Sequence, residues 1–178
     1  GDVEDHRQKL VGQPTWSDSG GGTIVCRGDN DVKTKNLTRR LAVEFARGIG
    51  TDAAIVDVCT SDNGTHWQIP LFALHDVTLD EAGGTFLVTS TSGQSLKGTV
   101  LHPKGAKLAT GTRPRGSDIE GVKENKWITV KSDDGAFAIV LTMAAKGGTH
   151  PAVKADGTWT GAPKGVITVG AAPFTVEG

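Results

Sequence analysis

Nucleophilic catalysis needs a serine, cysteine or threonine beside a base, and this sequence offers few such arrangements. It contains no Gly-x-Ser-x-Gly motif, in which a sharp strand-to-helix turn exposes a reactive serine. Cys26 and Cys59 lie in apolar, strand-like runs, where a thiol is usually inert. Tyrosine is absent from all 178 residues, so no phenolic acid or base is available. The sequence therefore predicts no catalytic residue.

Asp57 is the one acid at the centre of a strongly apolar run, residues 53–59. A glycosidase needs two carboxylates facing one cleft, so a lone acid does not predict glycoside hydrolysis. We expect the Asp57 carboxylate to face solvent or to pair with an arginine of the preceding strand, such as Arg39, Arg40 or Arg47. The alternative is burial beside a polar partner that satisfies the charge.

Metal binding would draw on His66 and His75, with Asp76 beside the second histidine. Nine positions separate the two histidines, and an odd separation places them on opposite faces of a strand. The two cysteines cannot form a structural zinc site alone, because such a site takes four ligands. They are expected to be buried thiols, or else a disulfide across neighbouring strands. We therefore expect no metal and no cofactor.

Carbohydrate binding would use exposed aromatic rings that stack on sugars, with polar groups around them. Trp16 and Trp159 stand among Gly, Ser, Thr and Asp residues and are the candidates for an exposed platform. Trp67 and Trp127 alternate with strand residues and are expected in the core. The polar candidates for contacts to a glycan are Arg39, Arg40 and His66.

These side chains must be positioned by strands, because strand-like runs recur every 10 to 15 residues with turn residues between them. The expected strands are Thr23–Arg27, Leu37–Arg47, Ala53–Thr60, His66–Val77, Thr85–Thr89, Ser95–His102, Lys107–Thr110, Lys126–Lys131, Ala136–Met143, Gly165–Val169 and Pro173–Val176. A helix over Thr38–Ala46 is the competing interpretation of one of them, since its residues favour helices. The pattern predicts an all-β fold, a two-sheet antiparallel β-sandwich of about ten or more strands.

Several finer features follow from the same pattern. Pro70 lies inside an expected strand, which favours an edge position or a bulge. The polar stretch Gly111–Asn125 is expected to be a long surface loop. We expect one domain over residues 1–178, with 1–22 as an N-terminal lead-in and 146–178 as a Gly-, Ala- and Pro-rich segment along the edge of the sandwich.

Composition excludes some partners. With 19 basic and 20 acidic residues the formal charge is −1, so we expect no nucleic-acid partner, which would call for a concentrated cationic surface. No stretch approaches the roughly 18 to 20 apolar residues of a membrane span, so no membrane partner is expected. The acidic, polar N-terminus does not resemble a signal peptide. A secreted or periplasmic location is expected if a leader has been removed.

Five segments between Ile24 and Met143 follow one another in a recognisable order and spacing: Arg39–Phe45, Ala54–Val58, His66–His75, Gly93–Ala106 and Gly135–Leu141. In this order and spacing, the middle of the chain resembles the C-terminal β-sandwich of heparinase II/III-like polysaccharide lyases. The first two are similar to paired strands of the pattern R-R-x-x-x-F and I-V-V-D-x-V. The fourth, with its Leu, His-Pro and Ala positions, is similar to a segment G-x-x-L-x-x-x-x-L-x-P-x-x-A.

The resemblance implies a part of an enzyme that does not itself react. Members of this family join a helical toroid to β-sheet domains and cleave uronic-acid polysaccharides by β-elimination, using Tyr and His. This chain has no Tyr and no toroid sequence, so no catalytic residue is carried over onto it. The implied partners are an acidic polysaccharide and a helical catalytic domain of the same parent protein.

Three functions remain open from the sequence. The first is an accessory β-sandwich of a polysaccharide lyase-like protein, glycan-associated and not catalytic by itself. The second is a stand-alone carbohydrate-binding or adhesion module that uses Trp16 or Trp159. The third is a purely structural or assembly β-sandwich. Fold analogy alone does not choose among them.

Overall fold

This computed structural model describes the backbone of residues 11–17, 21–30, 34–44, 54–60, 66–72, 75–114 and 124–177. Side chains are described for residues 54–60, 66–69, 71, 75–112 and 126–177. Within these ranges the chain forms strands and turns and no helix, so the all-β prediction is confirmed. No described residue belongs to a helix long and apolar enough to cross a membrane.

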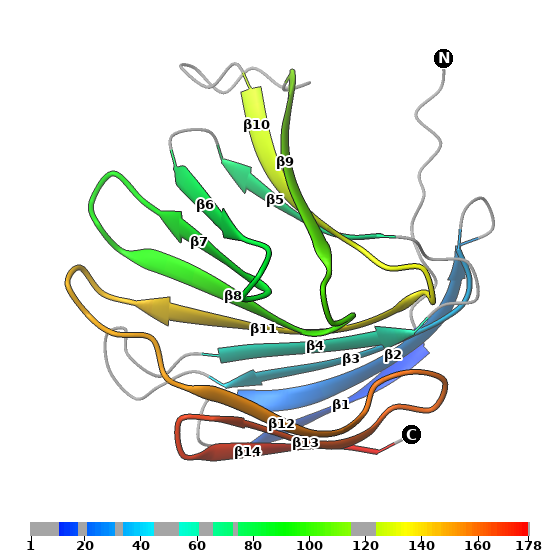
Figure 1. The fold of residues 1–178 in the computed structure, drawn as a ribbon. Helices are drawn as coiled ribbons and strands as arrows, with labels where there is room; N and C mark the ends of the chain where they lie inside the picture. Colours follow the sequence, from blue (N-terminus) through cyan, green and yellow to red (C-terminus); the bar gives the residue numbers. More distant parts are fainter. Residues whose placement is uncertain are drawn as a thin grey trace.

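Fourteen strands are described, in three antiparallel sheets (Figure 1). In chain order they are β1 (Val11–Ser17), β2 (Gly21–Asn30), β3 (Thr34–Glu44), β4 (Ala54–Thr60), β5 (His66–Phe72), β6 (Asp76–Asp80), β7 (Thr85–Thr89), β8 (Ser95–His102), β9 (Lys107–Pro114), β10 (Glu124–Lys131), β11 (Ala136–Ala144), β12 (Val153–Thr158), β13 (Lys164–Val169) and β14 (Ala172–Val176). The large sheet has the order β1-β2-β3-β4-β11-β8-β7-β6, and the two small sheets have the orders β5-β10-β9 and β12-β13-β14.

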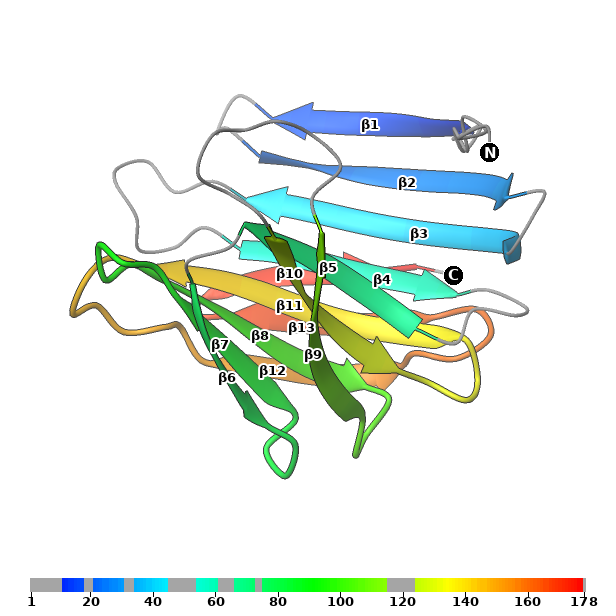
Figure 2. The same ribbon diagram turned by 90° about the horizontal axis from the view of Figure 1, so that it is seen from above.

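The two central strands of the large sheet, β4 and β11, are covered on both faces. Their sequences, AIVDVCT and AFAIVLTMA, are almost continuously apolar, as expected of strands that face no water. Alternate residues of β11 serve different layers. Phe137 and Ile139 pack toward the β5-β10-β9 sheet, whereas Ala138 and Val140 pack toward the β12-β13-β14 sheet. Figures 1 and 2 show the large sheet lying between the two smaller ones.

The core between the large sheet and the β5-β10-β9 sheet is built around aromatic side chains. The ring centroids of Trp67 and Phe86 lie 6.3 Å apart, with the ring planes tilted by 34°. The Phe86 ring lies directly over Gly98 of the neighbouring strand, where a Cβ atom would overlap it. Glycine therefore makes room for a phenylalanine at this point of the sheet. The prediction that Trp67 is a core residue is confirmed, since its side chain is buried.

Several expected strands match the structure closely. The bounds of β7 and β8 are those expected, and Pro70 lies on β5, which is an edge strand of its sheet, as proline at this position predicts. The helix considered for Thr38–Ala46 is wrong over the described residues, because β3 pairs with β2 as far as Val43 and with β4 as far as Glu44. Neighbouring strands here overrode the helix propensity of the local sequence.

Other expectations need correction. The run His66–Val77 is not one strand: β5 and β6 belong to different sheets, and the chain changes layer between them. The stretch Gly111–Asn125 is not wholly a loop, because its two ends extend β9 and β10, and residues 115–123 lie outside the described part. The segment 1–22, expected as a lead-in, contains β1 and the start of β2.

The segment 146–178 does not follow an edge of the fold. It contains β12, β13 and β14, which form a third sheet over the face of β4 and β11 that carries Val56, Val58 and Val140. Strand β12 was not predicted, because its sequence VKADGT is polar and its side chains are almost all exposed. Gly157 of β12 lies opposite Gly165 of β13. The two strands approach so closely there that a Cβ on either glycine would contact backbone atoms of the other strand.

Candidate functional site

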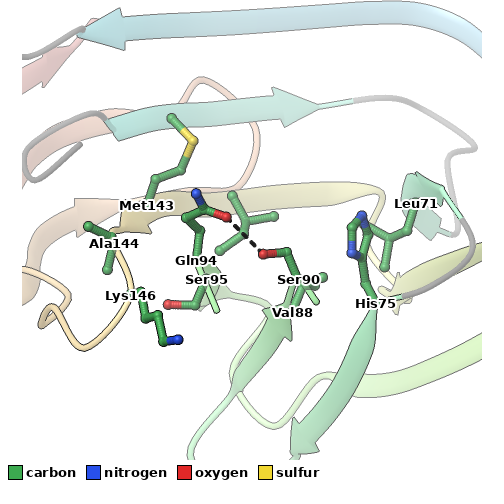
Figure 3. A pocket seen from close by; sticks show the side chains of 11 residues that line it. Leu71, His75, Val88, Ser90, Gln94, Ser95, Met143, Ala144 and Lys146 are labelled. Atoms are coloured by element: carbon green, nitrogen blue, oxygen red, sulfur yellow. Dashed lines mark hydrogen bonds between the residues drawn. The ribbon is translucent and has the colours of Figure 1, made fainter. Parts of the chain in front are cut away.

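A pocket of about 420 Å³ opens at one end of the space between the large sheet and the β5-β10-β9 sheet. Its apolar walls come from both layers: Leu71 from β5, Val88 from β7, Leu96 from β8 and Met143 from β11. Figure 3 shows Met143 and Lys146 on one side of the pocket and His75 and Leu71 on the other. The volume falls in the range of about 300–1,000 Å³ that is typical of small-molecule sites.

The polar groups of the pocket come from turns at the strand ends. Ser90 and Gln94 belong to the turn between β7 and β8, and Lys146 follows the end of β11. The Gln94 carbonyl oxygen accepts hydrogen bonds from the hydroxyls of Ser90, at 3.0 Å, and of Ser92. This leaves the Gln94 amide hydrogens as donors. Among the eleven described lining residues there is no aspartate and no glutamate, so the polar part of the pocket is rich in donors.

His75 brings an unusual group to the pocket. Its backbone carbonyl accepts a hydrogen bond of 3.2 Å from the Lys126 ammonium of β10. Its imidazole Nδ1 is buried and has no hydrogen-bond partner within the described part of the structure. In Figure 3 the edge of the ring that carries both nitrogens faces Val88 and Ser90, across the pocket. A buried polar atom without a hydrogen-bond partner lowers the stability of the fold by about 1–3 kcal/mol. A ligand that forms a hydrogen bond with this nitrogen would recover that free energy.

A second polar cluster meets the pocket at Ser95, which is one of the lining residues. His150 bonds through Nε2 to the Ser95 hydroxyl, at 2.9 Å, and through Nδ1 to the Thr142 hydroxyl, at 3.0 Å. The Thr142 hydroxyl in turn donates to the Lys97 carbonyl, at 3.5 Å. Since that hydroxyl gives its proton away, it accepts from Nδ1–H, and we assign Nε2 as the acceptor of the Ser95 proton.

The His150 pKa is lowered from its ordinary value of 6.5, first because the ring is partly buried and then because the Lys97 charge is near; a hydrogen bond to the Thr142 backbone opposes the shift. A neutral serine–histidine pair has the components of a nucleophile and its base. Ser95 lines the pocket, but strand alternation directs its side chain to the opposite face of β8 from Leu96, towards Thr142 and His150. We therefore interpret the cluster as a tie between β8, β11 and the segment that follows β11.

A contact between His102 and Asp134 holds the turn that joins β10 to β11. His102 Nε2 lies 2.8 Å from Asp134 Oδ2, and Asp134 also accepts hydrogen bonds from the Ser132 hydroxyl and the Ala136 backbone N–H. Burial raises the Asp134 pKa, but the hydrogen bonds from Ser132, Ala136 and His102 outweigh it, so the pKa lies below the ordinary value of 3.8. This arrangement holds the turn between β10 and β11 against the end of β8.

Asp57 corrects the expectation of a solvent-facing carboxylate. The residue is 2% exposed, and Oδ2 accepts a hydrogen bond of 2.9 Å from the Trp67 indole N–H, so the carboxylate is buried beside a polar partner. The expected pairing with Arg39, Arg40 or Arg47 involves side chains outside the described part and stays a prediction. The register places Asp57 opposite Leu41 and Ile139, so both neighbours on the sheet are apolar and the carboxylate is directed into the core between the sheets.

The expected aromatic platform is corrected in part. Trp159 is 8% exposed and packs in the core between the large sheet and the β12-β13-β14 sheet, with its ring over Gly165, so it presents no free face to a sugar. The side chain of Trp16 lies outside the described residues, although β1 contains its backbone. Trp127, expected in the core, is half-buried over Gly111.

The other sequence candidates are dispersed. Arg39 and Arg40 lie on β3 opposite Cys59 and Val58 of β4, but their side chains lie outside the described part. His66 is exposed at the start of β5. His66 is not among the described lining residues of the pocket, and the polar lining residues Ser90, Gln94 and Lys146 were not singled out from the sequence.

The disulfide alternative does not fit the register. Cys26 on β2 lies opposite Arg39 on β3, and Arg39 lies opposite Cys59 on β4, so a whole strand separates the two cysteines. Two strand spacings amount to about 10 Å, beyond the roughly 7 Å limit between the Cα atoms of a disulfide. In the described ranges, no group of three or more His, Cys, Asp or Glu side chains is arranged to hold a metal ion.

No family model and no curated protein sequence matches the chain. Solved structures do match in fold. The heparan sulfate lyase HepC from Pedobacter heparinus aligns with a TM-score of 0.54 and 12% identity, over 96% of this chain and 28% of that one. A heparinase III gene product aligns with a TM-score of 0.61 and 14% identity, over 95% and 27%. A further heparinase III structure aligns at 0.54 and 13%, over 93% and 27%.

The likeness has a clear extent. Nearly all of this chain aligns, but it spans little more than a quarter of the length of those lyase structures. At 12–14% identity the similarity is one of fold. This chain therefore has a heparinase-like fold, all-β in its described part.

Proposed function

We propose that this chain is an accessory β-sheet domain of a polysaccharide lyase-related protein, associated with an acidic glycan and not catalytic by itself. One observation carries the proposal: 93–96% of the chain aligns with heparinase III structures, but it covers only 27–28% of their length. A domain of this extent would act beside a larger partner. In the family that the sequence resembles, that partner is a helical catalytic domain.

The chemistry of the described side chains supports a non-catalytic role. β-Elimination needs a group that abstracts the proton next to the uronate carboxyl group and a group that protonates the leaving oxygen. No tyrosine exists in the chain. His102 is held by Asp134, and His150 is held between Ser95 and Thr142, so both rings serve contacts between strands and turns.

Glycan association is the finer part of the proposal. Arg39, Arg40 and His66 are the basic side chains that we propose for contacts to carboxylate or sulfate groups, because arginine matches such groups with paired hydrogen bonds. A stand-alone carbohydrate-binding module is less well supported, since the burial of Trp159 removes one of the two aromatic platforms on which that function depended.

Two readouts on one sample test this function. The chain is incubated with heparan sulfate, and both the retained glycan and the release of unsaturated uronate are followed. We expect retention without release. Release in proportion to the amount of protein would overturn the non-catalytic role. Absence of retention on heparan sulfate and on other uronate polysaccharides would overturn the glycan association and leave a purely structural role.

A further inference from the structure

The pocket beside β7, β8 and β11 has a polar group at each end and an apolar middle. At one end lie the Lys146 ammonium and the amide of Gln94, and at the other lies the buried, unpartnered Nδ1 of His75 (Figure 3). Between the two ends, the apolar surface comes from Leu71, Val88, Leu96 and Met143, and the described lining residues include no Phe or Trp side chain. The pocket therefore offers little for stacking on a sugar and much for an aliphatic chain.

Charge decides which head group fits. Lys146 is the one lysine among the described residues of the lining, and no described acid there opposes it. The Gln94 carbonyl is already occupied by two serine hydroxyls, so the free capacity of its amide is to donate. The Lys146 ammonium and the Gln94 amide are both hydrogen-bond donors, and one of them is positively charged. This end of the pocket therefore favours a carboxylate, which can accept a hydrogen bond from each of them.

The second end needs a ligand group as well. Burying His75 Nδ1 against an apolar chain would leave the nitrogen unsatisfied, at a cost comparable to a lost hydrogen bond. An oxygen acceptor on the ligand would remove that cost by accepting from Nδ1–H. The Lys126 bond to the His75 carbonyl holds the backbone of this residue at the pocket.

We propose that this pocket binds a medium-length aliphatic carboxylate that carries a second oxygen acceptor at its far end, such as an α,ω-dicarboxylate. The first carboxylate contacts Lys146 and Gln94, the chain lies against Leu96 and Met143, and the far oxygen accepts from His75. This ligand site does not depend on the proposed glycan function, since the residues that would hold the ligand, Lys146, Gln94 and His75, are not those proposed for contacts to a glycan.

Calorimetric titration of the whole chain with four eight-carbon probes tests the proposal: octanedioate, octanoate, 1,8-octanediol and octylamine. We expect octanedioate to bind most tightly, octanoate about tenfold more weakly and octylamine not at all, because one hydrogen bond to a charged group is worth roughly a factor of ten or more. Equal binding of the diol and the dicarboxylate would overturn the charge argument. Tighter binding of glucuronate than of octanedioate would overturn the aliphatic ligand in favour of a sugar.

Substitutions at Lys146 and His75 test the two ends of the pocket separately. Lys146→Gln is expected to weaken both carboxylates about tenfold and to leave the diol unchanged, whereas His75→Leu weakens octanedioate and leaves octanoate unchanged. Lys104→Gln, an exposed lysine outside the pocket, is the matched control and should change neither. Met143 is 40% exposed, so Met143→Glu should fold and abolish carboxylate binding by repulsion. Unchanged octanoate affinity in both Lys146→Gln and Met143→Glu would contradict the site.

Discussion

The Trp67 indole N–H donates a hydrogen bond of 2.9 Å to the buried Asp57 carboxylate, joining β5 of one layer to β4 of the next. Both residues are almost fully buried among apolar side chains, Trp67 beside Phe86 and Asp57 between Leu41 and Ile139 on the sheet. A contact of this kind is directional, whereas the apolar packing around it is not. It therefore helps to define how the β5-β10-β9 sheet sits on the large sheet.

Removal of the donor tests this contact. Trp67→Phe keeps a large ring in the core but takes one hydrogen bond from a buried carboxylate, so we expect the free energy of unfolding to fall by about 1–3 kcal/mol beyond the loss of ring volume. Denaturant unfolding measures the change. Trp127→Phe, at a half-buried tryptophan of the same sheet, is the matched control. Equal losses in the two variants would show that the Asp57 contact adds nothing.

The Gly98–Phe86 contact gives a second prediction. A Cβ at residue 98 would overlap the Phe86 ring, so Gly98→Ala is expected to destabilise the fold by about 1–3 kcal/mol through overpacking. Phe86→Leu removes the ring, and the double variant should then lose less than the sum of the two single losses. A double-mutant cycle by thermal unfolding measures that coupling; strictly additive losses would contradict the contact.

His150 predicts how stability depends on pH. Its pKa in the folded chain lies below the ordinary value of 6.5, so between the two values the unfolded chain binds more protons than the folded one. Stability should therefore be highest above pH 6.5 and fall as the pH drops from 6.5 towards the folded-state pKa. The groups that face the ring are Ser95, Thr142 and the nearby Lys97.

Unfolding titrations between pH 7.5 and 4.5 measure this slope. His150→Gln should flatten it, because the substituted side chain no longer titrates. Parallel curves for the parent and His150→Gln would contradict the assignment. Asp134, whose lowered pKa acts below pH 3.8, falls outside this window.

Much of the fold follows from local sequence signals. Strands β7 and β8 were predicted with their observed bounds, because turn residues flank each run and β-branched residues fill it. Pro70 predicted an edge strand because proline has no backbone N–H to donate to a neighbouring strand. Strand β12 could not be found this way, since its exposed polar sequence pairs with β13 through backbone groups that any residue carries.

The candidate site was much less predictable. Asp57 lies on a strand whose two faces are both buried, so the sequence pattern could not show which layer its carboxylate faces. It also could not show that the Trp67 indole donates a hydrogen bond to that carboxylate. Trp159 stands among polar and glycine residues in sequence, but the absence of a Cβ at Gly165 lets the ring approach β13 closely. The pocket joins residues from β5 to the turn after β11, and no short-range pattern connects them.

Association with an acidic glycan is tested most directly by the affinity of the chain for heparan sulfate and for a neutral polysaccharide, both measured at increasing salt. We predict binding to heparan sulfate alone, weakening as salt screens the charges, and about tenfold weaker binding after combined Arg39→Ala and Arg40→Ala substitution. Equal binding to both polysaccharides, or no binding to either at low salt, would contradict a role in association with an acidic glycan.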